Sequence, residues 1–417
     1  MPYSIRQYIP FVFLAAIGSV LVVGGKTPVY AGAFGLDEQG AAAMGRANAF
    51  AAQADDPSAL FYNPAGIGQL QGTQVSLATT LIAPSTTFEN SGSGNTTSTS
   101  SVLFYPTTFY AVHAIHENLH VGLGVFTPFG LSTEWPSNWE GRYVTTFSEI
   151  NTYYFNPNIE WSPNSHLHLA AGISYVPSSV TLRNKIDLSA LTLPDGESEV
   201  TADGDGWGYN VAALASLPGA NTLGVSFRSA VKIDYSGDNS TEPSAVVGPP
   251  QSVRSALTLP PILTIGLANR AINSLTLEAD FQWVGWSKIQ SITIDFVNPA
   301  SPDVTSVYNW QDSYSLRFGA EHSRGALTLR GGYAYDVSPV PSDTLDPSIP
   351  DSDKHTLSLG AGYHFGKTTI DVAYMFIRSN DRSVNRTITP VAGPPFVQQG
   401  TYSAQTQELG IGISYRF

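Results

Sequence analysis

The chain contains no cysteine among its 417 residues, which excludes disulfide bridges and any chemistry that needs a thiol. Charged residues make up only 13% of the sequence, against about 25% in an average soluble domain. Lysine and arginine number 20 against 33 acids, and this net charge of −13 lacks the basic surplus that nucleic-acid phosphates require. The composition therefore predicts a surface poor in charge and no nucleic-acid partner.

Long apolar runs are also missing, apart from one near the N-terminus. Phe11–Val23 is apolar, Arg6 precedes it, and Val29 and Ala31 form an A-x-A-like cleavage site. This arrangement is typical of a secretory signal peptide, and the run is shorter than the ~20 residues of a membrane-spanning helix. We expect residues 1–31 to be a signal peptide, with a membrane anchor as the alternative.

What the sequence has instead is a repeated alternation of apolar and polar residues. Between residues 409 and 417, Leu, Ile, Ile, Tyr and Phe occupy every second position, and the segments 275–283 and 370–376 repeat the pattern. A period of two residues is that of β-strands. Fourteen such segments lie near residues 74–88, 102–114, 119–127, 144–161, 166–184, 205–217, 221–235, 254–268, 273–295, 307–322, 326–336, 354–365, 368–378 and 402–417.

The connections between these segments alternate in length. Those after even-numbered segments are brief, such as HSR and GK, whereas those after odd-numbered segments are long, such as the Pro-rich stretch 337–353. Aromatic residues gather at segment ends, as with Tyr333 and Tyr335 or Trp283 and Trp286. Short turns on one side, long loops on the other and aromatic girdles are typical of outer-membrane barrels.

A sheet in lipid must close on itself, because lipid cannot satisfy the backbone groups at a free edge. We therefore predict an all-β fold for residues 73–417, a 14-stranded antiparallel transmembrane β-barrel in the outer membrane of a Gram-negative bacterium.

One stretch imitates a metal site. HAIHENLHVGLGVF, residues 113–126, has His116, Glu117 and His120 in the H-E-x-x-H order of zinc proteases, which binds metal only on a helix. Strand-like runs flank it here, so we interpret it as a turn between two strands with both imidazoles in water. There is also no G-x-S-x-G motif. We expect no metal, no cofactor and no enzymatic activity.

Residues 32–72 differ from the rest, being rich in Ala and Gly with short helical stretches near 41–51 and 57–62. A barrel of fourteen strands is wider than wall side chains can fill, so we expect this segment to form a small hatch inside the lumen; a periplasmic extension is the alternative. Charged residues cost several kcal/mol on a lipid face. We expect the following to face inward: Glu278, Asp280, Arg317, Glu321, Arg330, Asp336, His364, Asp371, Glu408 and Arg416.

Two stretches resemble a known family, the FadL/TodX-type outer-membrane transporters of long-chain fatty acids and hydrocarbons. AGAFGLDEQGAAAMGRA with ADDPSALFYNPAGI resembles the hatch of that family, whose signature falls here on Asn63, Pro64 and Ala65. LRGGYAYDVSPVPSDTLDPSIPDSDKHTLSLGAGYHF, residues 329–365, resembles a late strand, loop and strand of the family. The resemblance runs from about Gly32 to Phe417 and implies a hatch-closed barrel that carries hydrophobic molecules inward without an energy source.

The resemblance also implies roles for single residues. Hatch residues that reach into an apolar pocket correspond to Phe34 and Leu36. The substrate would leave sideways at a kink in the third strand, whose candidate residues are Gly122, Gly124, Pro128 and Gly130. Proline cannot donate to a ladder and glycine weakens one, but the sequence leaves open which pair forms the kink.

A fatty-acid carboxylate would need cationic partners, and no clear pair stands out. Candidate partners are Arg142, Arg183, Lys185, Arg228 and Lys232. We expect the chain to be a monomer that meets hydrophobic small molecules, outer-membrane lipid and lipopolysaccharide. The alternatives are a general or specific aqueous porin, against which the hatch argues, and a surface adhesin or receptor.

Overall fold

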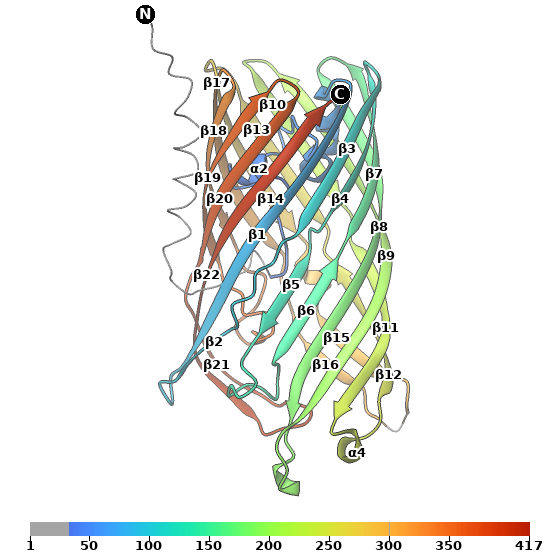
Figure 1. The fold of residues 1–417 in the computed structure, drawn as a ribbon, viewed down its shortest axis with the longest axis vertical. Coiled ribbons are helices and arrows are strands. Elements are labelled where there is room, and N and C mark those ends of the chain that lie inside the picture. The colour runs from blue at the N-terminus through green and yellow to red at the C-terminus, as the bar shows by residue number, and fades with distance from the viewer. Residues whose placement is uncertain (1–32, 300) are drawn as a thin grey trace, which may run out of the picture.

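The computed structural model describes residues 33–299 and 301–417, so the expected signal peptide at residues 1–31 lies outside the described residues. The described strands form one antiparallel barrel of fourteen wall strands, which confirms the predicted fold (Figure 1). The wall strands are β1 (Thr73–Asn90), β3 (Thr107–His116), β4 (Leu119–Phe126), β7 (Tyr154–Asn164), β8 (Leu167–Ile186), β9 (Gly196–Leu217), β10 (Asn221–Arg228), β13 (Ile262–Asn269), β14 (Leu275–Val284), β17 (Ser313–Arg324), β18 (Leu327–Asp336), β19 (Lys354–Phe365), β20 (Thr368–Ser379) and β22 (Phe396–Arg416).

Shorter strands extend the wall or lie in its long loops. They are β2 (Thr96–Ser98), β5 (Gly130–Glu134), β6 (Phe147–Thr152), β11 (Val231–Glu242), β12 (Gln251–Leu259), β15 (Ser291–Phe296), β16 (Val304–Val307) and β21 (Arg382–Ile388). Each wall strand pairs with the next in the chain, and the ring closes where β1 pairs with β22 from Gln74↔Arg416 to Asn90↔Gly400. This closure joins the last wall strand to the first, as a sheet in lipid requires.

The two ends of the barrel differ as the connection lengths predict. The C-terminus lies at the end with the short turns, and β2, β21 and the helix α4 (Ser244–Val247) lie at the opposite end (Figure 1). By the usual orientation of such barrels, the short turns face the periplasm and the long loops face the cell exterior.

The wall is apolar outside and polar inside. On β19, Leu357 and Leu359 are 59% and 69% exposed, while Thr356 and Ser358, which alternate with them, are buried. The predicted inward charges follow the same phase: Arg330 forms ion pairs with Glu321 (2.7 Å) and Asp371 (2.6 Å) across three strands. Exposed leucine beside buried serine fits a protein whose outer solvent is lipid. Among the described residues, no helix is long and apolar enough to cross a membrane.

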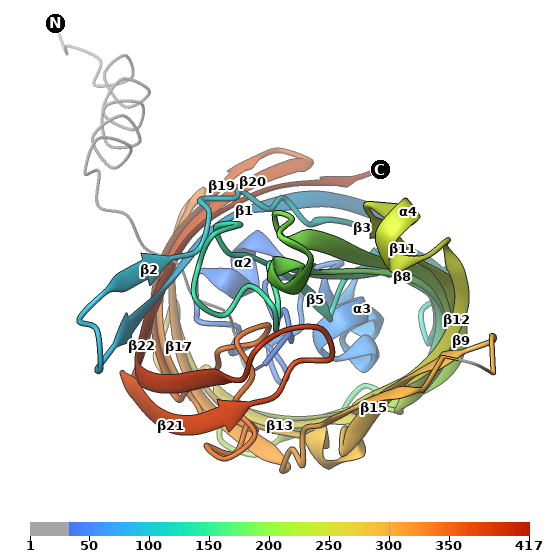
Figure 2. The same ribbon diagram turned by 90° about the horizontal axis from the view of Figure 1, so that it is seen from below.

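The N-terminal segment, residues 33–72, lies inside the ring of strands (Figure 2). It contains α2 (Ala41–Met44), α3 (Ala59–Tyr62) and the 3-10 helix η2 (Pro64–Gln69), shorter than the predicted helical stretches. Two further 3-10 helices, η3 (Ser189–Leu191) and η4 (Trp286–Lys288), lie outside this segment in the long loops of the barrel. α2 packs against β19, β20 and β22, and η2 against β7, β8 and β9.

Two wall carboxylates hold the N-terminal segment through its backbone. Asp280 Oδ2 accepts from the amides of Phe50 (2.9 Å) and Ala51 (3.0 Å). Glu278 accepts from the amides of the next two residues, Ala52 (2.6 Å) and Gln53 (3.1 Å). Four amides that have no helical or strand partner are thereby satisfied, and hydrogen bonds to charged groups are the stronger kind.

Two expectations about single residues are wrong. Trp286 is not part of an outer aromatic girdle, because β14 ends at Val284 and the following turn places the Trp286 ring inside, only 2% exposed. His120 is not in water, because it is the second residue of β4 and faces inward, 3% exposed, under the end of the N-terminal segment. His116 and Glu117 do lie exposed at the turn. In both errors a strand boundary decided which side of the wall a side chain faces.

Close packing between wall and N-terminal segment gives a matched pair of substitutions. A Cβ on Gly332 would lie 2.2 Å from the carbonyl carbon of Arg46, whereas one on the neighbouring Gly331 would meet its nearest atom at 3.7 Å. We expect Gly332→Ala to weaken the seating of the segment by about 1 to 3 kcal/mol through overpacking, and Gly331→Ala to change it little. Hydrogen exchange of residues 40–55 measures the difference; equal protection in both variants contradicts this packing.

Candidate functional site

The start of the N-terminal segment forms an arm, residues 34–39, that pairs with a break in the wall. The amide of Leu36 donates to Pro128 O (2.8 Å), and the amide of Gly130 donates to Phe34 O (2.9 Å). Gly35 and Phe129 form an isolated antiparallel bridge. The arm therefore supplies the backbone partners that residues 128–130 lack in the wall.

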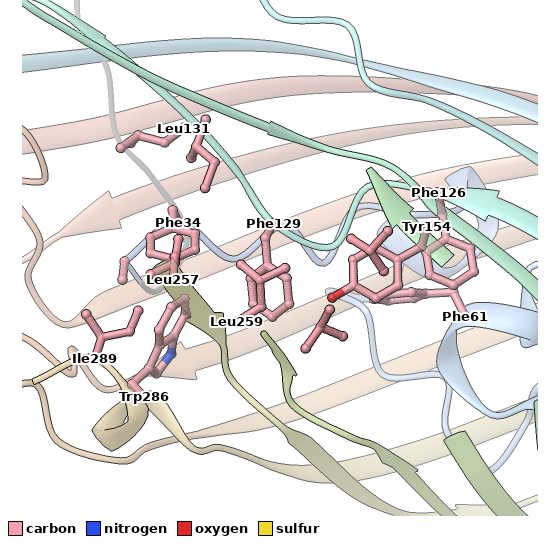
Figure 3. Packing of buried hydrophobic residues seen from close by; sticks show 14 of the residues in the cluster. Phe34, Phe61, Phe126, Phe129, Leu131, Tyr154, Leu257, Leu259, Trp286 and Ile289 are labelled. Atoms are coloured by element: carbon pink, nitrogen blue, oxygen red, sulfur yellow. The ribbon is translucent and has the colours of Figure 1, made fainter. Parts of the chain in front are cut away.

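Phe34 sits in an aromatic cluster (Figure 3). Its ring lies 4.8 Å from Trp286, 5.8 Å from Trp310 and 5.9 Å from Phe129, measured between centroids. The four side chains come from the arm, the wall break and the long loop between β14 and β17, and all are nearly fully buried. No local sequence pattern predicts that Trp286 and Trp310 belong to this site, because both are distant in the chain from Phe34.

Phe34 also lines a cavity of about 350 Å³, which we call the outer cavity. Its walls are mostly aliphatic and aromatic, and include Phe34, Leu131, Ile150, Val180, Leu257 and Ile349. Apolar walls with few polar groups are characteristic of sites for small apolar ligands.

The wall beside this cavity is incomplete. β1 pairs with β3 only as far as Thr79↔Thr107; beyond it, Ile82 bonds to Phe104 in a segment without a strand partner. On the other side, β4 ends at Phe126, and β5 pairs with β6 and with no other strand of the described residues. No ladder joins β1 to β5, which leaves a gap in the wall.

A second cavity of about 530 Å³ occupies this gap, and we call it the wall cavity. Leu36 lines it from the arm, Ile82 from β1, and the exposed Tyr105 and Tyr153 from its outer side. Leu131 lines both the wall cavity and the outer cavity. The two cavities are therefore neighbours with Leu131 between them.

Two of the four kink candidates lie within a paired strand, and the other two lie at the break in the wall. Gly122 and Gly124 lie inside the paired part of β4, opposite Asn158 and Asn156 of β7. A Cβ on Gly122 would lie 2.7 Å from Leu60, so this glycine makes room for the N-terminal segment. Pro128 lies in the interruption between β4 and β5, and Gly130 is the first residue after it. The strand thus breaks at Pro128.

The Asn63-Pro64-Ala65 motif fastens the N-terminal segment. The Asn63 amide donates to Ala51 O (2.7 Å) and to Ala213 O of β9 (3.2 Å), and its oxygen accepts from the amide of Ala65 (3.1 Å). Pro64 starts η2, a position that needs no amide hydrogen. Ala65 is fully buried and packs against Ala170, Ala212 and Leu214 of the wall.

The candidate carboxylate partners are already engaged. Arg142 pairs with Asp195 (2.6 Å), Arg183 with Glu199, Lys185 with Glu197 (2.7 Å) and Lys232 with Asp234 (2.5 Å). Arg228 lies under the segment, 4.9 Å from the centre of the Phe126 ring and 3.4 Å from Phe61 O. Of these five, only Arg183 lines the outer cavity; Arg254, which the sequence analysis did not single out, also lines it.

Two carboxylates line the wall cavity, and the sequence analysis assigned neither to a route. Glu149 borders both cavities. Glu408 faces inward from β22 beside Ile82, only 3% exposed, and its Oε2 has no hydrogen-bond partner. The alternation of β22 predicted that Glu408 faces inward, but not that a gap in the wall opens beside it.

The described residues contain no group of three or more His, Asp or Glu side chains placed to hold a metal ion. His120 and Glu160 do meet in the lumen, but the pair joins a strand to the N-terminal segment.

Comparisons with known proteins agree with this geometry. The sequence profile of the family described as outer membrane protein transport protein (OMPP1/FadL/TodX) matches residues 22–417. A long-chain fatty acid transport protein of Escherichia coli strain K12 is 25% identical, over 86% of this chain and 91% of that protein. Two solved structures are similar in fold. A FadL homologue of Pseudomonas aeruginosa has a TM-score of 0.83 at 21% identity, covering 92% of this chain and 100% of the other. The toluene transporter TodX of Pseudomonas putida has a TM-score of 0.73 at 18% identity, covering 93% and 100%.

The hydrogen bonds of Asn63 predict a local effect of its removal. Asn63→Ala leaves the carbonyl groups of Ala51 and Ala213 without these partners in a buried place, which costs about 1 to 3 kcal/mol. We expect faster hydrogen exchange in residues 50–70. Asn385→Ala, on the exposed strand β21, is the control, and unchanged exchange in Asn63→Ala would show that the motif does not fasten the segment.

The arm should seat more weakly as the pH rises. Burial, with the neighbouring Asp37 carboxylate second, raises the pKa of Glu38 from 4.5 to about 7. A carboxyl group with a raised pKa binds its proton more tightly in the docked arm, so docking is favoured at acidic pH and weakened between about pH 4.5 and 7. We expect protection of residues 34–40 to fall on the order of a hundredfold from pH 5 to pH 8. Glu38→Gln should abolish this change, and the exposed control Glu117→Gln should keep it.

Proposed function

Because this chain belongs to the outer membrane protein transport family that includes OMPP1, FadL and TodX, we propose that it is a passive outer-membrane channel for hydrophobic compounds. The observation that carries the proposal is the pair of apolar cavities that meet at Leu131, one among the long loops and one in a gap of the wall. Family members are transport proteins; the absence of enzymatic activity stays a prediction.

The proposed route avoids the axis of the barrel. A hydrophobic molecule enters the outer cavity from the long loops, passes Leu131 and leaves through the wall cavity into the lipid. The break at Pro128 is the proposed kink, with Gly130 beside it, whereas Gly122 and Gly124 serve packing. A lateral exit suits an apolar molecule because it never has to cross an aqueous compartment.

The N-terminal segment is proposed to be the hatch, with residues 32–72 as its limits and residues 73–417 as the barrel. Its turns lie across the lumen, fastened by Asp280, Glu278 and Asn63. Phe34 and Leu36 are then the hatch residues that sense the ligand, because Phe34 lines the outer cavity and Leu36 the wall cavity. A seated hatch argues against an aqueous porin.

Similar proteins are named for long-chain fatty acids and for toluene, and the charges of the route favour a neutral cargo. An anionic headgroup meets Arg183 and Arg254 in the outer cavity, but Arg183 is already paired with Glu199. At the wall cavity it meets the carboxylate of Glu149, which borders both cavities. Like charges in a low-dielectric passage repel strongly, so we propose that hydrocarbons, or fatty acids in their protonated form, pass more readily than fatty-acid anions.

The remaining partners follow from the outer surface. The exposed leucines and isoleucines of the wall are proposed to lie against outer-membrane lipid and lipopolysaccharide. The ring closes within one chain and the arm bonds to the gap in its wall, so no second copy is needed to satisfy the backbone; a monomer is the proposed state. A role of the long loops as an adhesin or receptor can coexist with transport.

Filling the point where the cavities meet tests the route. We expect Leu131→Trp to lower the uptake of a neutral hydrocarbon such as toluene by at least about tenfold while binding in the outer cavity persists, because the indole obstructs the passage. Uptake is measured in cells that depend on this barrel, and binding by ligand-induced thermal stabilisation of the purified protein.

The matched control is Leu357→Trp, on the lipid-facing side of β19, which should leave uptake unchanged. Normal uptake in Leu131→Trp would contradict the proposed lateral route past Leu131. Equal uptake of toluene and of a long-chain fatty-acid anion at neutral pH would contradict the proposed preference for neutral cargo. It would not contradict the lateral route.

A further inference from the structure

The imidazole of His120 joins the wall to the end of the N-terminal segment. His120 lies on β4 and is 3% exposed. Its Nδ1 is 2.7 Å from Glu160 Oε2 on β7, and its Nε2 is 3.1 Å from the carbonyl oxygen of Leu70, which follows η2. Both ring nitrogens therefore face oxygen atoms inside the barrel.

The number of hydrogens in this contact follows from its geometry. A carbonyl oxygen only accepts, so Nε2 must donate to Leu70 O. Nδ1 and the Glu160 carboxyl then need a second hydrogen between them, either on the imidazole or on the carboxyl group. A neutral imidazole beside a carboxylate has one hydrogen too few, and one lone pair of the ring would face an oxygen at hydrogen-bond distance.

The surrounding side chains hold the pair in place. Glu160 is fully buried, and its Oε1 accepts from Ser162 Oγ (2.5 Å). His168 Nδ1 lies 2.6 Å from Ser162 Oγ and 3.1 Å from Glu160 Oε1. Gly68 of η2 passes over these atoms, where a Cβ would lie 2.4 Å from both Glu160 Oε1 and His168 Nδ1. Wall and segment are thus fitted to each other at this point.

We propose that His120 is a positioning residue that fastens the periplasmic end of the hatch through a shared proton with Glu160, so that the fastening weakens when the proton is lost. The inference rests on the proposed function of residues 32–72 as a hatch. Rising pH removes the proton, and one of the two hydrogen bonds of His120 must then break. The fastening is complete at acidic pH and is lost toward alkaline pH.

Other titratable groups near the site are few. The ion pairs of Glu160 within the described part of the chain are those with His120 and His168. From β3, His113 contacts Thr73 Oγ1 (2.8 Å) and is exposed, so it does not face the pair. Glu38 belongs to the arm. Its pH effect is measured by hydrogen exchange of residues 34–40, whereas the effect of His120 is measured on residues 64–72.

Hydrogen exchange of residues 64–72 in the full-length barrel tests the proposal between pH 5 and pH 10, after correction for the intrinsic pH dependence of exchange. We expect protection in the unsubstituted protein to fall about tenfold with rising pH, the equivalent of one hydrogen bond to a charged group. His120→Gln and Glu160→Gln should each remove this step, and the control His113→Gln should keep it.

Constant protection of the unsubstituted protein across this range, or an unchanged step in His120→Gln, overturns the proposal. Should the two variants fail to fold, nitrogen NMR of labelled histidines in the unsubstituted protein decides: one buried imidazole must titrate with the same midpoint as the exchange step, and no such imidazole overturns it. Ion conductance in planar bilayers separates the two proposals. A conducting barrel with an intact step refutes the hatch, and a closed barrel without a step refutes only the proton-linked fastening.

Discussion

Every backbone amide and carbonyl in the wall needs a partner, because lipid offers none. Most of the ring meets this demand by pairing neighbouring strands, and the exception is the gap between β1 and β5. There Pro128 and Gly130 bond to the arm, and Ile82 bonds to Phe104. The hydrogen bonds that satisfy the backbone of Pro128 and Gly130 at the gap therefore also connect the gap to the arm. Any movement of the arm must change the backbone partners of the gap. Under the proposed function, this would connect ligand contact at Phe34 with the gap in the wall.

Charge inside the barrel serves mainly to hold the N-terminal segment. Asp280 and Glu278 accept from four consecutive amides of that segment, and Arg317 pairs with Asp37 of the arm at 2.7 Å. A buried carboxylate is costly unless several donors surround it, and a turn with free amides supplies them without any lysine or arginine. This arrangement explains how a chain with so few basic residues carries so many inward acids.

The two cavities differ in ways that suit the proposed channel for apolar molecules. The outer cavity offers apolar walls and the aromatic cluster of Phe34, whereas the wall cavity opens among the exposed side chains of Leu103, Tyr105 and Tyr153. The proposed transfer between them would need no opening along the barrel axis, so the N-terminal segment could stay seated while cargo passes. The Glu149 carboxylate, which borders both cavities, supports the proposal that a neutral molecule fits this path better than an anion.

The sequence by itself determined the barrel, because alternation is a local property. The alternation of Leu357, Ser358 and Leu359 indicates which side of the wall faces lipid. The lengths of the connections indicate which end faces the periplasm and which faces the cell exterior. Through its resemblance to a known family it also predicted roles for Asn63, Phe34 and Leu36, and these stay predictions. Only the tertiary structure decided that the strand breaks at Pro128 and that Trp286 and Trp310 contact Phe34. It also decided that the two ring nitrogens of His120 face Glu160 and the carbonyl oxygen of Leu70. These contacts join residues far apart in the chain, and their geometry depends on the stagger of the closed ring, which no local pattern encodes.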